Sequence, residues 1–203
     1  MQLNAQEIGL NIKMKLIYKG KFNSDPESLP HGEHKAGAVK FKEPETPKKM
    51  AIIGNALALV ITVAALIGIF VRSGFETNFN IWGIGVSLLC MFPHEFLHAI
   101  CFKEEVYLYT NFKQGMLFVT GPETMSKTRF VIMSLLPNIV FGFIPYIIFM
   151  CFPKLTFFGS LGAISIGMGA GDYYNVFNAL TQMPKGARTY IYGFSSYWYM
   201  ENR

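Results

Sequence analysis

The stretch from Ala51 to Val71 reads AIIGNALALVITVAALIGIFV and carries no charged residue. A helix crosses the hydrocarbon of a bilayer in about 20 residues, so this stretch is long enough to span a membrane. Three further apolar stretches, at about residues 80–102, 130–152 and 155–180, are of similar length. The pattern predicts an all-α membrane protein with four transmembrane helices, at about 51–71, 80–102, 130–152 and 155–180.

The composition supports this prediction. Hydrophobic residues make up 51% of the 203 residues and charged residues only 15%, whereas about 25% of a soluble protein is charged. The 19 Phe residues exclude a disordered chain, which would be poor in aromatic residues. The three Cys residues cannot all pair with one another, which argues against a disulfide-stapled secreted module.

The basic residues predict the orientation in the membrane. Of the 18 Lys and Arg residues, only Arg72 and Lys154 lie on one side of the four expected spans, and sixteen lie on the other. Because basic residues are retained in the cytoplasm, we expect an integral protein of the plasma membrane with both termini cytoplasmic. The net charge of +5 then favours attraction to anionic lipid headgroups and not binding of nucleic acid.

Two regions follow from this arrangement: a cytoplasmic N-terminal segment, 1–49, and a four-helix membrane metallopeptidase-like domain, 50–203. Ile12 to Phe22 alternates weakly and could form a strand, while the rest of the segment has the pattern of a tether. In the loop between the second and third spans, Thr110 to Val119 could form a short β-hairpin around Gln114-Gly115. Aromatic residues of the C-terminal tail are typical of an interfacial belt: Tyr190, Tyr192, Tyr197, Trp198 and Tyr199.

The second apolar stretch contains His94-Glu95-Phe96-Leu97-His98, an H-E-x-x-H pattern. Residues four apart on a helix lie on one face, so both imidazoles can hold one zinc ion. Glu95, displaced by one residue, can take a proton from the water that attacks a substrate. The simpler alternative is a polar cluster that only holds helices together.

A catalytic zinc needs a third protein ligand, and Asp172 is the only other acidic residue in the four stretches. His94, His98 and Asp172 all lie between four and eight residues from the expected cytoplasmic ends of their spans. Asn138 and Asn55 fall at a similar depth. The sequence therefore predicts a Zn²⁺ site of His94, His98 and Asp172 in one layer near the cytoplasmic face.

Small residues and a proline surround this layer. Ala163, Gly167 and Gly171 recur at every fourth position, a pattern that lets transmembrane helices approach closely and would bring Asp172 to the zinc. Pro137 precedes Asn138 and frees a backbone carbonyl at the same level.

Other metal ligands are possible. His31 and His34 have suitable spacing but lie in the polar N-terminal segment, where a solvated turn is the simpler interpretation. Cys90 and Cys101 flank the H-E-x-x-H pattern, although thiols in membrane helices usually act as small apolar side chains. Glu104 or Glu105 could also supply the third position.

Residues from about 50 to 199 resemble a family of small membrane proteins of unknown function described as zincin peptidases. The resemblance rests on the Pro93 to Ala99 run, on Pro137, on Gly171-Asp172-x-x-Asn175, and on a tail with Met183 to Ala187 and Tyr197-Trp198. The chain is also similar to intramembrane zinc peptidases of the site-2-protease type. It departs from that type around Asp172, which Gly171 precedes and Tyr173 follows.

We therefore expect a membrane-embedded zinc metallopeptidase that cleaves a membrane-associated peptide or protein near the cytoplasmic side. His94, His98 and Asp172 would hold Zn²⁺, Glu95 would act as general base, and Asn138 could donate a hydrogen bond to the substrate or oxyanion. The alternative is a non-catalytic, zinc-stabilised scaffold or an accessory subunit of a transporter or peptide-maturation system. A transporter is disfavoured because the ionisable residues cluster at one depth.

Overall fold

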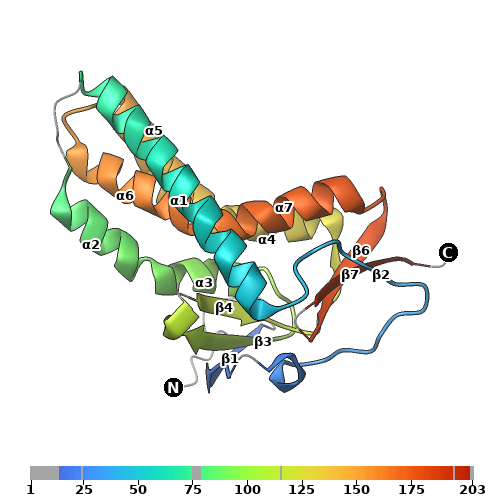
Figure 1. Cartoon of the computed structure of the whole chain (residues 1–203). Helices are drawn as coiled ribbons and strands as arrows, with labels where there is room; N and C mark the ends of the chain where they lie inside the picture. Colours follow the sequence, from blue (N-terminus) through green and yellow to red (C-terminus); the bar gives the residue numbers. More distant parts are fainter. Residues whose placement is uncertain (1–13, 24, 75–78, 115, 194, 202–203) are drawn as a thin grey trace, which may run out of the picture.

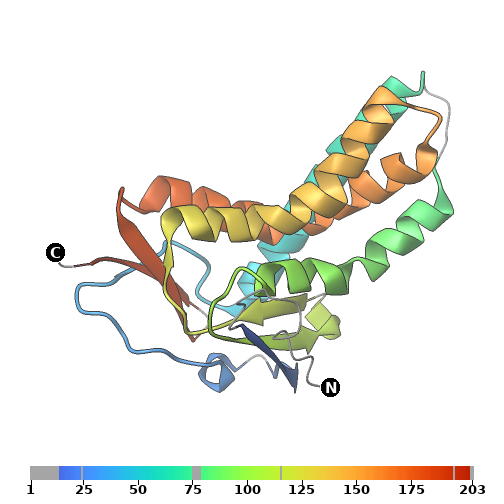
Figure 2. The same cartoon turned by 180° about the vertical axis from the view of Figure 1, so that it is seen from behind.

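A computed structural model of the chain describes residues 14–23, 25–74, 79–114, 116–193 and 195–201. The protein is a mixed α/β molecule with a helical arm at one end and two small sheets at the other (Figures 1 and 2). We use the name arm for helices α1 (Pro47–Arg72), α2 (Ile81–Leu89), α5 (Ile144–Cys151) and α6 (Thr156–Met168). At the base of the arm lie α3 (Met91–Ala99), α4 (Lys127–Pro137) and α7 (Ala170–Gln182).

Two of the helices are long enough to cross a membrane. The first is Lys48–Arg72, within α1, and the second is the continuous helix Lys127–Cys151, made of α4, the π-helical turn η4 (Asn138–Phe143) and α5. Each begins at a hydroxyl cap, since the side chains of Thr46 and Ser126 accept hydrogen bonds from the backbone N–H of Lys49 and Arg129.

The prediction of four transmembrane helices in an all-α protein is wrong. The expected span at 80–102 is two helices, α2 and α3, which break at Cys90, and the expected span at 155–180 is α6 and α7, which break at Gly169. Pro93 has no N–H to bond the carbonyl of Leu89, which favours the first break. None of these pieces exceeds 13 residues, well short of the roughly 20 that a span requires.

Strands also contradict the all-α prediction. One sheet has the order β1-β3-β4, formed by β1 (Lys15–Lys21), β3 (Glu105–Asn111) and β4 (Met116–Thr120). The other has the order β2-β7-β6-β5, formed by β2 (Val39–Lys40), β5 (Met125–Ser126), β6 (Ala187–Tyr192) and β7 (Ser195–Met200). The expected hairpin is confirmed, because β3 and β4 pair antiparallel across the 3₁₀ turn η3 (Phe112–Gln114).

The described part of the N-terminal segment is folded and is not a tether. The strand expected within Ile12 to Phe22 is present as β1, which pairs parallel with β3, although residues 12 and 13 lie outside the described residues. After the short 3₁₀ turn η2 (Pro26–Ser28), β2 joins the second sheet beside β7. Phe22, Leu29 and Phe41 are buried, which fixes the segment to both sheets. That 1–49 and 50–203 are separate domains stays a prediction.

The small residues of α6 pack against neighbouring helices, but they do not form one continuous small-residue face that extends to Asp172. A Cβ at Gly167 would lie 1.8 Å from the Thr62 hydroxyl of α1, so Gly167 lets α1 and α6 touch. Gly171 has open space around its Cβ position and lies on α7, beyond the break at Gly169. The repeat therefore serves the packing of the arm, while a different glycine, described below, positions the acid.

Candidate functional site

Helix α3 presents the H-E-x-x-H residues at the base of the arm. His94, Glu95 and His98 are all buried, with 9%, 8% and 6% of their surfaces exposed. One helical turn separates the two histidines, and their rings lie with centroids 4.8 Å apart. Because α3 packs between α4 and β4, the three side chains face the interior and not the outer surface.

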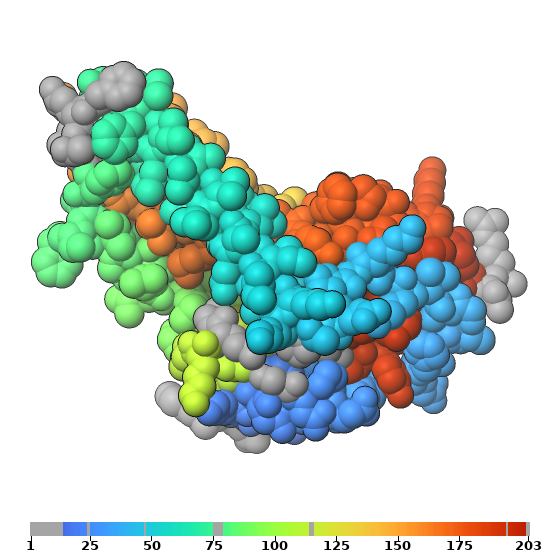
Figure 3. All heavy atoms as spheres, in the orientation of Figure 1, coloured from blue at the N-terminus to red at the C-terminus, as the bar shows by residue number. Residues whose placement is uncertain are grey.

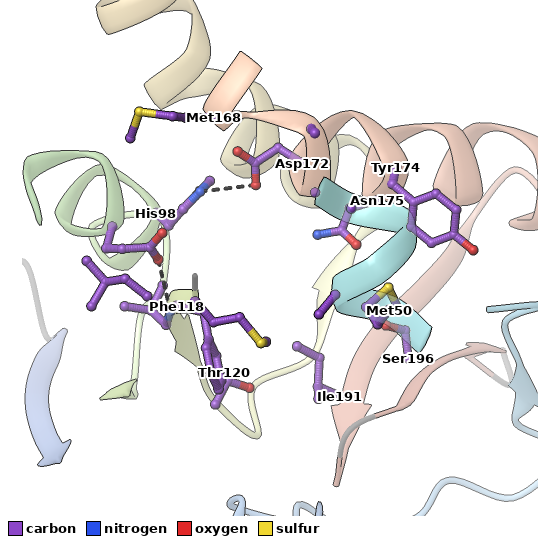
Figure 4. A pocket seen from close by; sticks show the side chains of 18 of the residues that line it. Met50, His98, Phe118, Thr120, Met168, Asp172, Tyr174, Asn175, Ile191 and Ser196 are labelled. Carbon is purple, nitrogen blue, oxygen red and sulfur yellow. Dashed lines mark hydrogen bonds and ion pairs between the residues drawn. The ribbon is translucent and has the colours of Figure 1, made fainter. Parts of the chain in front are cut away.

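Asp172 comes from the first turn of α7 and contacts both histidines. Figure 4 shows it beside His98. Its Oδ2 lies 3.1 Å from Nε2 of His94, and its Oδ1 lies 3.2 Å from Nε2 of His98. Two ligands that are each about 2.0–2.1 Å from a tetrahedral ion lie about 3.3 Å from one another. The spacing and the donor types therefore fit one zinc ion, held by two imidazoles and one carboxylate.

The orientation of His98 is set by a proline in the neighbouring helix. Its Nδ1 lies 2.9 Å from the backbone carbonyl oxygen of Met133, to which it donates. That carbonyl would accept the N–H of residue 137 in an uninterrupted α-helix, but Pro137 has none. With Nδ1 committed to this carbonyl, Nε2 is the nitrogen directed toward Asp172, and its lone pair becomes available to a metal ion once its proton is lost.

Asn138 holds Asp172 in place. Its Nδ2 donates to Asp172 Oδ2 at 2.7 Å and to the carbonyl oxygen of Ser134 at 3.0 Å, and the residue is only 1% exposed. Both amide hydrogens are thus used inside the protein. A Cβ at Gly169 would lie 1.6 Å from Asn138 Oδ1, so a glycine is required there. The break between α6 and α7 thereby makes room for the residue that orients the acid.

Glu95 points toward the neighbouring sheet. Its Oε2 accepts a hydrogen bond from the backbone N–H of Val119 in β4, at 2.9 Å. Its carboxylate oxygen lies within 4.8 Å of the ligand nitrogens of His94 and His98, near enough to act on the same reacting atom. Of the two nearby acids, Asp172 contacts both Nε2 atoms, whereas Glu95 is fastened to β4. Of these two acids, Asp172 has the position that fits a third ligand beside both histidines.

Burial and the paired charges shift the acidities in the site. Burial raises the pKa of the Glu95 carboxyl to about 8, and the charge of His98 only partly opposes this. Burial also disfavours ionised Asp172, but hydrogen bonds from His94 and His98 outweigh it and hold the pKa of that carboxyl below its usual range. For His98, burial lowers the pKa, while Asp172 raises it more, to about 9.

A cavity of about 490 Å³ opens onto these residues. Its wall includes His94, Glu95, His98 and Asp172, together with the whole of β4, the first turns of α1 and part of α7. Figure 4 shows Asp172 and His98 on one side, Phe118 and Thr120 of β4 below, and Asn175 and Ser196 farther away. Asn55, expected at the depth of the zinc, also lines this cavity, whereas Asn138 does not.

The other candidate ligands lie elsewhere. His31 and His34 contact tyrosines of the second sheet, with Nδ1 of His34 3.1 Å from the hydroxyl of Tyr190. Neither Cys90 nor Cys101 lines the cavity, and both are free thiols. Glu105 pairs with Lys15 on β1, and Glu104 is exposed.

Sequence reasoning missed three contributors to the site. Gly169 could have been noticed as a helix breaker within the run Gly167-Met168-Gly169, because glycine disfavours a helix interior. Val119 acts through its backbone N–H, which no side-chain pattern reveals. Glu43 lines the cavity from the N-terminal segment, far from the motif in sequence, and carried no signal of its own.

Two histidines one turn apart, a glutamate beside them and an acid from a second helix define a zincin-like site. The chain belongs to the family described as "Putative zincin peptidase", whose model matches residues 87–188. This region contains His94, Glu95, His98 and Asp172 as well as Asn138 and Gly169. Searches of curated proteins and of solved structures gave no match.

Proposed function

We propose that this protein is a membrane-embedded zinc metallopeptidase that hydrolyses a peptide bond of a membrane-associated substrate near the cytoplasmic side. The observation that carries the proposal is the convergence of both Nε2 atoms on the Asp172 carboxylate, with Glu95 beside them on the wall of one cavity. Three donors at ligand spacing next to a potential base are what metal-assisted hydrolysis requires.

We assign each residue of the site a separate role in hydrolysis. His94, His98 and Asp172 hold the zinc, which when bound supplies Lewis-acid activation of the reacting carbonyl and water. Glu95 takes a proton from the attacking water and returns it to the leaving amine. Its hydrogen bond from Val119 N–H keeps one carboxylate oxygen occupied, leaving the other to face the reacting atoms. Asn138 acts on Asp172, as a positioning residue.

An extended peptide is the substrate that suits the cavity wall. In the described sheet, β4 pairs only with β3, so its other edge is open. Because the N–H of Val119 points to Glu95 and alternate residues of a strand point the same way, Leu117 also directs its N–H and C=O away from β3. A substrate strand could hydrogen-bond to this edge and present its backbone to the site.

Membrane embedding is supported by the surface of the arm. Only 11% of the apolar window of Lys48–Arg72 is buried in the molecule, whereas the core helix of a soluble protein would be mostly buried. Leu59 and Val60 are each 65% exposed, and α1 lies on the surface of the arm in the face that Figure 3 shows. Lys48 and Lys127 begin the two long helices, and these basic ends support a cytoplasmic location for the sheets and the site. A buried site beside membrane helices is the arrangement that we liken to site-2 proteases.

The test is Glu95→Gln, assayed with purified protein in proteoliposomes against model peptides anchored in the same vesicles. Zinc content should stay near that of the unchanged protein, while cleavage should fall by at least 100-fold because the base is lost. Glu104→Gln, an exposed acid near the same helix, is the control and should keep full activity. Zinc binding without cleavage of any peptide would instead favour the zinc-stabilised scaffold or accessory subunit.

A further inference from the structure

The cavity wall holds a third acidic residue, Glu43, besides Glu95 and Asp172. Besides the four site residues, Glu43 is the one acidic or basic side chain among the residues of the described chain that line the cavity. Its surroundings there include Leu29, Met50 and Ile191. Figure 4 shows Met50 and Ser196 well apart from His98, on the opposite side of the pocket. A single carboxylate therefore lies beside Ser196 at the end of the proposed substrate cavity away from His98.

Backbone hydrogen bonds fix the position of Glu43. Its Oε1 accepts from the N–H of Ser196 in β7. Two residues earlier, Phe41 donates its N–H to the carbonyl oxygen of Ser196 at 2.9 Å. The side chain is therefore held on the cavity wall and cannot turn freely into solvent, as an ordinary glutamate of a loop would.

The Glu43 carboxylate has no basic partner. Within the described ranges, its hydrogen bonds come from the backbone and the side chain of Ser196, and no Lys, Arg or His lies within ion-pair distance of it. Lys40 influences it through its charge and not by contact. Burial of this kind raises the pKa of Glu43 to about 7, a cost that an incoming cation would relieve.

We propose that Glu43 forms an acidic specificity subsite that binds a protonated amine of the peptide substrate. This inference rests on the proposed peptidase function and names the substrate class: peptides carrying an amine a few residues from the cleaved bond. β4 lines the cavity over its whole length, Met116–Thr120, and an extended peptide paired with it would cover about five residues. The amine is either a lysine side chain or a free N-terminus.

A purely structural role for Glu43 is the competing explanation, since its bond to Ser196 also fastens the N-terminal segment to β7. Glu43→Gln separates the two roles, because the amide oxygen still accepts the N–H of Ser196 while the negative charge is lost. Glu45→Gln removes an equal charge two residues away, from an exposed side chain that does not line the cavity. It is the matched control.

The experiment compares three anchored peptides of one sequence: one with lysine, one with norleucine at the same position, and one whose only amine is its N-terminus. With unchanged protein and with Glu45→Gln, we expect kcat/KM for either amine peptide to exceed that for the norleucine peptide by at least 10-fold. In Glu43→Gln this ratio should fall to about 1. An equal ratio in all three proteins would overturn the subsite, and preference for only one amine peptide identifies the source of the amine.

Binding gives a readout that does not depend on turnover. In the zinc-loaded Glu95→Gln background, the lysine peptide should bind at least 10-fold more tightly than the norleucine peptide, and adding Glu43→Gln should abolish the difference. If no peptide is cleaved but this difference is seen, the peptidase proposal fails while the amine-binding site stands. If peptides are cleaved and no difference is seen, only the subsite is wrong.

Discussion

The Nδ1 atom of His98 lies 2.9 Å from the backbone carbonyl oxygen of Met133. This contact joins the proposed metal site to the second long helix, since Met133 belongs to α4 and His98 to α3. The carbonyl is available because Pro137, one turn later, has no N–H to offer it. A proline inside a helix, usually a defect, here provides the acceptor that orients a metal ligand.

Replacing that proline should weaken zinc binding. Pro137→Ala restores an N–H that competes with His98 for the Met133 carbonyl, and we expect a loss of about 10- to 100-fold in zinc affinity, as for other partners of metal ligands. Competition with a chelator would measure it. Pro145→Ala makes the same change one turn or more away, in α5, and should leave the affinity unaltered. Equal losses in both variants would mean that only helix geometry matters.

Asp172→Ala should lower the zinc content of purified protein about as much as His98→Ala does. The reason is that either change removes one of three proposed ligands and leaves buried partners unpaired. Metal analysis after gel filtration gives the answer. The control is Asp25→Ala, at the only other aspartate in the sequence, which is exposed. Full zinc content in Asp172→Ala would remove this residue from the ligand set.

Gly169→Ala and Gly171→Ala form a matched pair. A methyl group at Gly169 would collide with the Asn138 side chain, so this variant should lose about 1–3 kcal/mol of unfolding free energy and bind zinc less tightly. A Cβ at Gly171 would have no atom within 4 Å, so the free energy of unfolding of Gly171→Ala should change by less than about 0.5 kcal/mol. Thermal unfolding with and without zinc would compare them, and similar effects at both positions would refute the positioning role of Asn138.

The acidity of Glu43 predicts a dependence of stability on pH. Its pKa is raised from 4.5 to about 7 by burial, so the folded protein holds this proton more tightly than the unfolded chain. The resulting stabilisation is complete below about pH 4.5 and is lost as the pH rises through 7. Glu43→Gln should therefore gain stability relative to the unchanged protein between pH 5 and 8, measured by thermal unfolding. For Glu45→Gln, the difference in stability from the unchanged protein should stay constant between pH 5 and 8.

The orientation in the membrane can be tested with reporter fusions. A reporter at the C-terminus or within residues 103–129 should report the cytoplasm, because Lys48 and Lys127 begin the two long helices and basic residues favour that side. A reporter inserted after Ser73, where α1 has ended, should report the opposite side. A cytoplasmic signal from this last fusion would show that Lys48–Arg72 does not cross the membrane.

The sequence predicted that His94, His98 and Asp172 lie together, which the structure confirms, but it predicted the wrong fold around them, and their binding of zinc stays a prediction. His94 and His98 are one turn apart on any helix, so their common direction did not depend on whether the helix continued past Cys90. Asp172 was chosen for its depth in an assumed continuous span. The structure instead brings it to the site through the break at Gly169, which depends on contact with Asn138 and could not be read locally.

The strands were partly predictable. The Gln114-Gly115 pair within Thr110 to Val119 indicated the β3–β4 hairpin, because turn residues act locally. The hairpin of β6 and β7 was mistaken for an interfacial belt of aromatic residues. Tyr190 stacks on Tyr197, and Tyr197 contacts His34 edge-to-face. Gly193 at the turn has φ of +60°, which favours glycine. Composition alone could not distinguish aromatic residues that face lipid from aromatic residues that pack on one another in a sheet.

Glu43 and Ser196 touch across 153 residues of chain, and this has a consequence for biosynthesis. During synthesis β1 can pair with β3 as soon as β3 has been made. β2 can pair only after β7 has been made, about 85 residues after β3. At about 5–20 residues per second, that interval lasts on the order of 5–20 s on the ribosome. A nascent chain thus carries all of the H-E-x-x-H helix well before the cavity has its second wall. The cavity wall that contains Glu43 can therefore form only after β7 has been made and has paired with β2.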